Sequence, residues 1–176
     1  EFNKVLEASF SFLNETITAK RIKQIVTEAI SRLPQDEVAL LIDAIKNLGF
    51  AAATESGLSV SVTDCEMIEE KVEIVERANR QVEEIQSQFQ DGFISAEERK
   101  RLSFDVWMKT TDEVAEKTWD SYDENNAVKV MINSGGTRAS KDQVKQLAAM
   151  RGLVVDPLGN IVEMPTKSNF RQGLTI

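Results

Sequence analysis

The chain contains no histidine and only one cysteine, Cys65, among its 176 residues. A single cysteine excludes an intramolecular disulfide and is typical of a protein from a reducing compartment. A zinc site is not expected, because zinc is held mainly by cysteine and histidine side chains. No nucleophile can be paired with a histidine base, and no cationic residue that would activate the thiol adjoins Cys65 in the sequence.

Long apolar runs and nucleotide-binding glycine patterns are also missing. No run approaches the roughly 18 apolar residues of a membrane span, and the N-terminus lacks the basic and apolar regions of a signal peptide. The stretch "SGGTRAS", residues 134–140, lacks the glycine spacing and the Gly-Lys-Ser/Thr ending of a phosphate-binding loop. No Asp-x-Asp-x-Asp run is present. We therefore expect no catalytic residue, no metal site, no cofactor and no membrane partner for this chain.

Charge is distributed unevenly along the sequence. Residues 1–65 carry 9 acidic and 6 basic side chains, residues 66–124 carry 17 and 8, and residues 125–176 carry 3 and 7. The acidic middle part should repel nucleic acid, whereas the basic last part is suited to phosphate groups. These three ranges also differ in pattern, so we treat them as three segments.

The first segment, residues 1–65, predicts a helical hairpin. Thr18 can cap a helix that ends at Pro34, and a second helix follows as far as Gly49. Apolar residues recur at helical spacing in both: Ile22, Ile25, Val26 and Ile30, then Val38, Leu41, Ile42 and Ile45. Beyond them, apolar and small polar residues alternate over 58–63, which predicts a short strand.

The second segment, residues 66–124, predicts a projecting antiparallel coiled-coil hairpin. Its apolar residues keep coiled-coil spacing on both sides of the turn "QDGF". Ser95 can cap the second helix, and Glu98 three residues later would complete a capping box. Helices of about 25 residues, at about 1.5 Å per residue, would reach on the order of 35 Å. Two interpretations remain: a solvated structural strut, or a protrusion whose tip meets a partner.

The third segment, residues 125–176, predicts a short helix, a glycine-hinged link and a β-hairpin near 152–165. Arg138 follows the pair Gly135-Gly136 and precedes a helix that opens at Ser140, with Lys145 further along it. Flexible glycines and a helix N-terminus suit a transient phosphate contact. The alternative is a link in which Arg138 bonds a backbone carbonyl. The whole chain is thus expected to be mainly α, with small β elements.

Three long stretches resemble one family in collinear order. They are "NLGFAAATESGLSVSVTD", "EIQSQFQDGFISAEERKRLSFDVW" and "QLAAMRGLVVDPLGNIVEMPTKSNFRQGL", and they are similar to the beta-prime (largest) subunit of bacterial multisubunit RNA polymerase. The resemblance covers essentially the whole chain and falls just upstream of the bridge helix. It implies a piece of a longer nucleotidyltransferase subunit that works in the cytoplasm, on the nucleoid, with beta, alpha, omega and sigma subunits.

The resemblance also implies roles for particular residues. The chain would line the secondary channel, through which nucleoside triphosphates reach the active site, with Arg138 and Lys145 on their path. The projecting hairpin would correspond to the rim helices, where channel factors of the Gre and DksA types dock. The docking residues would be Glu98, Arg99, Arg101 and Leu102.

Two features depart from the family pattern. "SGGTRAS" is one residue longer than the usual Ser-Gly-Ala-Arg-Gly, and Arg101 and Leu102 stand where relatives carry Asn and Lys for guanosine tetraphosphate. The Asp-rich loop that holds catalytic Mg²⁺ in the family does not occur in this sequence, so we expect the chain alone to be inactive. The rival interpretation is a free-standing cytoplasmic coiled-coil adaptor.

Overall fold

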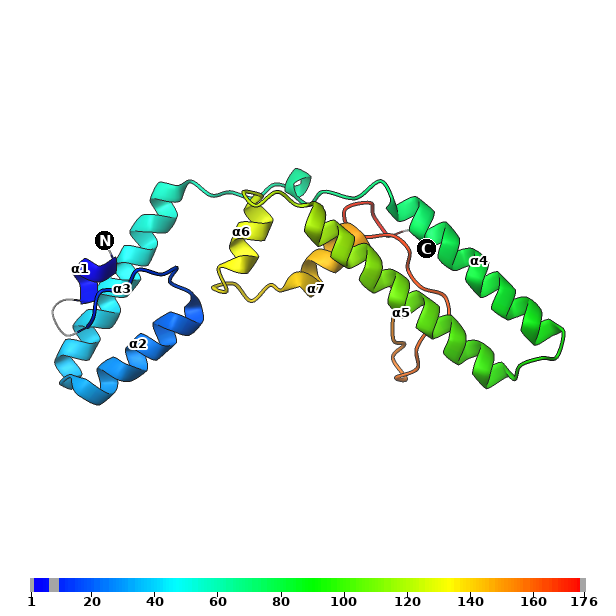
Figure 1. The fold of residues 1–176 in the computed structure, drawn as a ribbon, viewed down its shortest axis with the longest axis horizontal. Coiled ribbons are helices and arrows are strands. Elements are labelled where there is room, and N and C mark those ends of the chain that lie inside the picture. Colours follow the sequence, from blue (N-terminus) through cyan, green and yellow to red (C-terminus); the bar gives the residue numbers. More distant parts are fainter. Residues whose placement is uncertain (1, 7–9, 175–176) are drawn as a thin grey trace. The chain divides into compact units, whose positions relative to one another are not determined.

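The computed structural model describes residues 2–6 and 10–174, and these residues are mainly helical (Figure 1). Contacts divide the chain into two units, which are described separately. Unit 1 comprises residues 1–60 and 130–138, and unit 2 comprises residues 61–129 and 139–176. Among the described residues, no helix is both long and apolar enough to span a membrane.

Unit 1 contains the expected helical hairpin. Helix α1 spans Phe2–Leu6, α2 spans Ala19–Arg32 and α3 spans Gln35–Ser56. The Thr18 hydroxyl accepts the backbone N–H of Arg21 at 3.3 Å, which confirms the predicted cap. The core of the unit joins residues from all three helices: Leu6, Ile25, Ala29, Val38 and Leu41.

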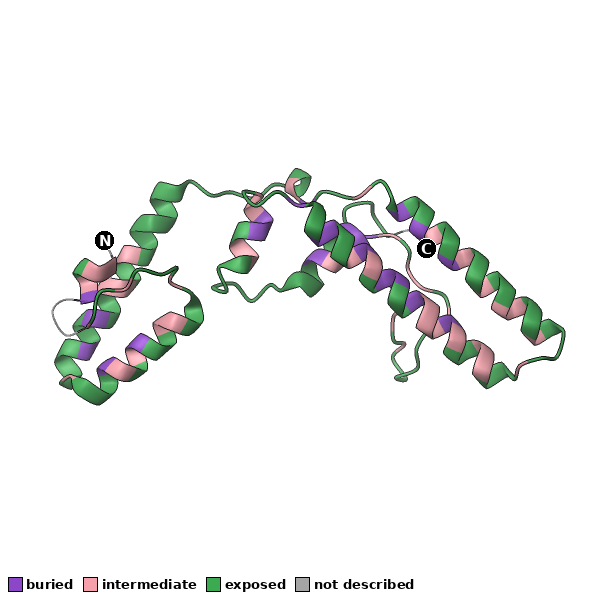
Figure 2. Ribbon diagram, in the orientation of Figure 1, coloured by how far each residue is buried: buried purple, intermediate pink, exposed green. Residues whose placement is uncertain are grey.

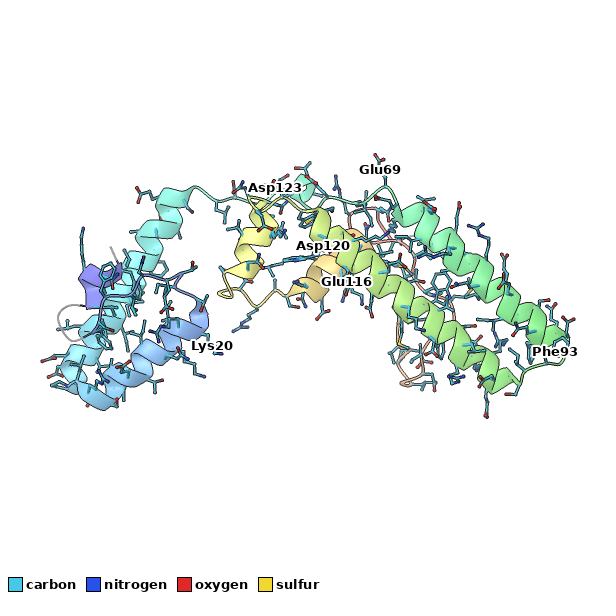
Figure 3. All side chains as sticks on the ribbon, in the orientation of Figure 1. Lys20, Glu69, Phe93, Glu116, Asp120 and Asp123 are labelled. Carbon is cyan, nitrogen blue, oxygen red and sulfur yellow. The ribbon has the colours of Figure 1, made fainter. Side chains whose placement is uncertain are left out.

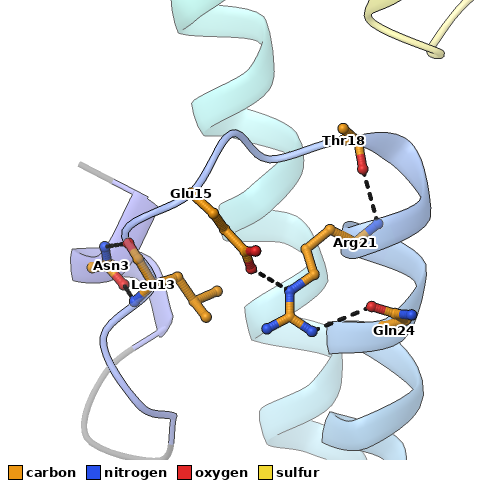
Figure 4. A network of polar contacts seen from close by, with 6 residues as sticks. All are labelled: Asn3, Leu13, Glu15, Thr18, Arg21 and Gln24. Atoms are coloured by element: carbon orange, nitrogen blue, oxygen red, sulfur yellow. Dashed lines mark hydrogen bonds and ion pairs between the residues drawn. The ribbon is translucent and has the colours of Figure 1, made fainter.

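The connection from α1 to α2 is held by side-chain hydrogen bonds (Figure 4). Asn3 exchanges two bonds of 2.8 Å with the backbone of Leu13. The Arg21 guanidinium donates to Glu15 at 2.6 Å and to Gln24 at 3.2 Å. These contacts fix the approach of the chain to the first turn of α2.

Two expectations about the end of this hairpin were wrong. Helix α3 passes through Gly49 and ends only at Gly57, whose φ of 60° suits a left-handed C-terminal cap. Residues 58–63 form no strand; Val62–Asp64 form a short 3₁₀ helix, η2. Ser61 and Asp64 cap it reciprocally, and such local bonds prevail because none of the described residues forms a strand that could pair with this segment.

Unit 2 contains the expected antiparallel hairpin. Helix α4 spans Lys71–Gln90, α5 spans Ala96–Ser121, and the two lie side by side (Figure 1). Gly92 in the turn has φ of 79°. The Ser95 hydroxyl accepts the N–H of Glu98 at 3.2 Å, as predicted. The Glu98 carboxylate does not close the expected capping box, because it accepts from Arg101 instead.

The hairpin packs along one face against the C-terminal part of the chain. Buried residues recur along much of α5 (Figure 2). Val114 and Trp107 of α5 form core clusters with Ala149 and Met150 respectively. Ala149 is the last residue of the π-helical turn η3, Lys145–Ala149, which follows α7, Lys141–Val144, and Met150 comes directly after η3. Only the distal part of the hairpin is therefore a protrusion.

The remaining elements precede and follow α7 in the sequence. Helix α6, Ala127–Asn133, agrees with the short helix expected over 125–134. Residues 152–166, called the arm below, reverse direction as expected, but they form only isolated antiparallel bridges, Gly152–Thr166 and Val155–Ile161. The Asp156 carboxylate closes the turn by accepting from the backbone of Leu158 and Asn160. Pro165 cannot donate to a ladder, which interrupts the pairing.

Candidate functional site

The first turn of α5 presents an ionic pair on its outer surface. Arg101 donates to both carboxylate oxygens of Glu98, at 2.5 and 3.1 Å. This hydrogen bonding, together with the positive charge of Arg101, lowers the pKa of Glu98. Both side chains are largely accessible, at 41% for Glu98 and 61% for Arg101. The pair is therefore available to a partner that approaches the hairpin tip.

Arg99 points to the interior, although it is the immediate neighbour of Glu98. Its guanidinium donates to Glu163 at 2.9 Å and to Gln86 at 3.5 Å. It also lies over the ring of Phe89, 5.5 Å from the centroid. The two residues that the family resemblance treats as one docking pair therefore face different surroundings.

Two apolar residues complete the distal part of the hairpin. Leu102 is half-buried, whereas Phe93 in the turn is 79% exposed and stands at the end of the hairpin (Figure 3). Sequence reasoning did not select Phe93. Its position in a five-residue turn, 91–95, between two amphipathic helices is the signal that would have found it.

Arg138 lies in unit 1, in the loop after α6. Its side chain is exposed and has no hydrogen bond or ion pair within the described part of the chain. Gly135 in the same loop has φ of 68°, and a Cβ there would lie 3.9 Å from the Cβ of Ala19. The loop therefore approaches the start of α2.

This approach brings a further cation into the same region, which sequence reasoning missed. Lys20 follows Ala19 directly and is exposed at the first turn of α2 (Figure 3). Lys23, one turn later, is exposed as well. The contact between Gly135 and Ala19 joins residues more than a hundred positions apart, so only the position of Lys20 just after the N-cap was visible in the sequence.

Lys145 lies in unit 2, at the start of η3. Its ammonium group is 2.7 Å from Oδ1 of Asp112 on α5, and the side chain is 25% exposed. It borders an open groove of about 400 Å³ between α5 and α7, which Glu116 and Asp120 also line. The structure thus assigns Arg138 and Lys145 to different units.

The backbone around Lys145 is held by the segment that follows the arm. The amide nitrogen of Asn169, a fully buried side chain, donates to the carbonyls of Ala148 and Ala149 at 2.7 and 3.1 Å. The backbone N–H groups of Phe170 and Arg171 donate to Gln146 and Leu147. Four carbonyls that a helix C-terminus leaves unpaired are thereby satisfied.

The described residues offer no metal centre. They contain no group of three or more His, Cys, Asp or Glu side chains that could hold an ion. Cys65 is buried, and burial raises the pKa of its thiol, which disfavours the reactive thiolate.

Comparison with known proteins shows to which protein family the chain belongs. Residues 66–173 match the model of the family described as "RNA polymerase Rpb1, domain 4". The match includes α4, α5, α7, η3 and the arm, so it covers the whole of the hairpin and its packing partner. The chain belongs to this family.

The similarity extends beyond the family model to nearly the full sequence. The chain is 39% identical over 175 residues to the DNA-directed RNA polymerase subunit beta' of Heliobacterium modesticaldum, and 38% identical to that of Pelotomaculum thermopropionicum. It is 41% identical over 177 residues to the subunit of Thermosipho africanus. Each alignment covers 99% of this chain, but the chain spans only 15%, 15% and 11% of these relatives.

Proposed function

We propose that this chain acts as part of the beta-prime subunit of a DNA-directed RNA polymerase, where it lines the channel through which nucleotides enter. The observation that carries the proposal is collinear similarity to beta' subunits over 99% of the chain. Such breadth favours a polymerase segment over a free-standing coiled-coil adaptor. The catalytic Mg²⁺ and the polymerase reaction would belong to parts of the enzyme beyond this segment, which would work in the cytoplasm with the beta, alpha, omega and sigma subunits.

The nucleotide path is supported by exposed cations. Arg138 has no partner within the described residues, and Lys20 is exposed in the same region of unit 1. A guanidinium keeps its charge at any working pH and can hold two phosphate oxygens at once. Such groups would bind a triphosphate only transiently, as expected of an intermediate binding site on an otherwise acidic protein.

Factor docking is supported by the tip of the hairpin. Phe93 offers exposed apolar area in the turn that precedes the Glu98–Arg101 pair in the sequence, and interfaces commonly combine an apolar anchor with a polar rim. A coiled-coil factor of the Gre or DksA type would contact this surface. The acidic character of residues 66–124 would attract a basic partner.

A photo-crosslink in the complete polymerase tests the docking role. A photoreactive phenylalanine analogue at Phe93 should capture a purified Gre- or DksA-type factor. The same analogue at Phe50 is the matched control, because that ring is 67% exposed but lies on α3 in unit 1. Equal labelling from both positions, or none from Phe93, would contradict docking at the tip.

A further inference from the structure

The first turn of α5 touches two different surfaces, one on each side. Glu98 and Arg101 face outward and hold each other. Arg99 faces the arm, where Glu163 accepts from its Nη2 at 2.9 Å and from Lys100 Nζ at 3.0 Å. Hydrogen bonds from Lys100 and Arg99, together with the positive charges of these residues, lower the pKa of Glu163. One helical turn thus joins the hairpin tip to a segment more than sixty residues later.

The contact between Arg99 and Glu163 is suited to opening. The Arg99 side chain is 21% exposed and that of Glu163 is 38%, and partly exposed ion pairs contribute little net stability. The Nε atom of Arg99 is buried and has no hydrogen-bond partner within the described residues. A buried donor without a partner costs free energy, which the side chain would recover in water. Opening of this contact would therefore cost little free energy, which is what a two-state element requires.

The base of the arm is continuous with the backbone that carries Lys145. Gly152 and Thr166 exchange two backbone hydrogen bonds that close the arm, and Met150 donates to the carbonyl of Lys145. Val155 and Ile161 of the arm line an open groove of about 330 Å³ that Lys145 also borders. A shift of the arm would therefore change the surroundings of Lys145.

We propose that Arg99 and Glu163 form a releasable link through which occupancy of the hairpin tip sets the position of the arm. Arg99 and Glu163 are then positioning residues, and the docking contacts are left to Glu98, Arg101 and Phe93. A partner that engages the first turn of α5 would alter the Arg99 side chain and so free or fix the arm. This regulatory part rests on the proposed function, because it needs a partner at the tip, whereas the link itself does not.

Hydrogen exchange in the complete polymerase, without any factor, tests the link. Arg99→Gln and Glu163→Gln should each speed amide exchange in residues 152–166 by about threefold, within the range expected for one partly exposed ion pair. The double variant should add little to Glu163→Gln, because that change alone already removes the carboxylate that Arg99 and Lys100 share. Arg101→Gln is the matched control, since its partner is Glu98 and not the arm. Unchanged exchange in the single variants, or an equal change in the control, would overturn the link.

A second series adds a purified coiled-coil channel factor. In the unchanged polymerase, saturating factor should alter exchange in residues 152–166 and shift the apparent KM for nucleotide. In Glu163→Gln the factor should bind with similar affinity, but both responses should disappear. Binding without any response in the unchanged enzyme would overturn the regulatory proposal. Absence of binding at the hairpin would instead contradict the proposed docking function, and the factor-free series would still decide whether the link exists.

Discussion

The ammonium group of Lys145 lies 2.7 Å from Oδ1 of Asp112, across the contact between η3 and α5. The protein thus partly neutralises a cation that the proposed nucleotide path would use. Because Asp112 is 69% exposed, the pair is accessible to solvent and its net strength is small. On the proposed nucleotide path, Lys145 would exchange this carboxylate for a phosphate group.

Removal of the Asp112 charge should make Lys145 a better phosphate contact. Asp112→Asn in the complete polymerase should lower the apparent KM for nucleotide by about two- to fivefold, the range of a surface ion pair, with little change in kcat. Lys145→Ala should raise the KM, and the double variant should resemble Lys145→Ala. Glu116→Gln, one turn further along α5, is the control for net charge. Equal effects of Asp112→Asn and Glu116→Gln would mean that the pair is irrelevant to nucleotide binding.

Arg138 provides the sharpest test of the nucleotide path. Arg138→Ala should raise the apparent KM by up to about tenfold, which corresponds to about 1.4 kcal/mol, and should leave kcat and the melting temperature nearly unchanged. The exposure of the side chain is the reason that stability should not respond.

Arg21→Ala is the control, because Arg21 is engaged by Glu15 and Gln24. That change should affect stability more than nucleotide dependence. A lower melting temperature for Arg138→Ala with unchanged KM would instead support a structural role, as in a link whose arginine bonds a carbonyl. Elongation rates against nucleotide concentration, measured beside melting curves, separate the two.

Reversal of charge at the outer surface of α5 should weaken factor docking. Glu98→Lys places a second cation beside Arg101 and removes a hydrogen-bond acceptor. Because the contact is accessible to solvent, its loss should weaken binding by about 0.5–1 kcal/mol, or about two- to fivefold in Kd. Glu97→Lys in the same turn controls for the change in overall charge. Titration of the complete polymerase with a labelled factor gives the affinities. The docking assignment fails if Glu98→Lys binds as tightly as the Glu97→Lys control.

Local signals in the sequence predicted most of the helices. Thr18, Ser95 and Ser140 each accept a backbone N–H in the first turn of the helix that they were expected to cap. The prediction that the helix ends at Gly49 was wrong. A glycine within a helix costs only about 1 kcal/mol relative to alanine, and good helix formers follow Gly49. Gly57 ends the helix because it adopts the left-handed conformation.

Features that depend on distant residues were not predictable in the same way. The alternation over 58–63 indicated a strand, but a strand needs a neighbour, and the sequence does not show whether one is present. The approach of Gly135 to Ala19 and the contact of Arg99 with Glu163 are likewise long-range. By contrast, the divergence of Glu98 and Arg99 follows from helix geometry, because adjacent residues on a helix do not share a face.

Gly152 is a position where both conformation and space require glycine. Its φ is 78°, and a Cβ would lie 2.9 Å from the Oγ1 atom of Thr111, which itself donates to the carbonyl of Trp107. Gly152→Ala should therefore destabilise the packing of the arm on α5 by more than the strain of about 1–2 kcal/mol that a left-handed alanine carries. Gly159→Ala is the control, since φ is 89° but no atom lies within 4 Å. Equal loss of hydrogen-exchange protection in both variants would show that the close contact with Thr111 adds nothing to the backbone strain.

Asn169 should be the most sensitive amide in unit 2, because it acts both as donor and as acceptor. Its side-chain nitrogen serves the carbonyls of Ala148 and Ala149, and its oxygen accepts the N–H of Gln172 at 2.8 Å. Asn169→Asp keeps the acceptor but turns a carboxylate oxygen toward two carbonyls. Loss of buried hydrogen bonds and this repulsion should cost about 3 kcal/mol or more at neutral pH.

The pH dependence distinguishes this cause from a general packing defect. In Asn169→Asp the introduced carboxyl would be buried against carbonyls, so its pKa should be raised in the folded state, and the protonated form can donate as the amide does. Stability should then recover as pH falls through that raised pKa, and should be poorest above it. Gln172→Glu is the matched control, because Gln172 Oε1 accepts from Lys71 at 2.6 Å and a carboxylate preserves that contact. The measurement is hydrogen exchange of residues 145–150 in the complete polymerase, corrected for the intrinsic pH dependence of exchange. If Asn169→Asp loses protection equally at every pH, the amide proton of Asn169 is not what holds η3.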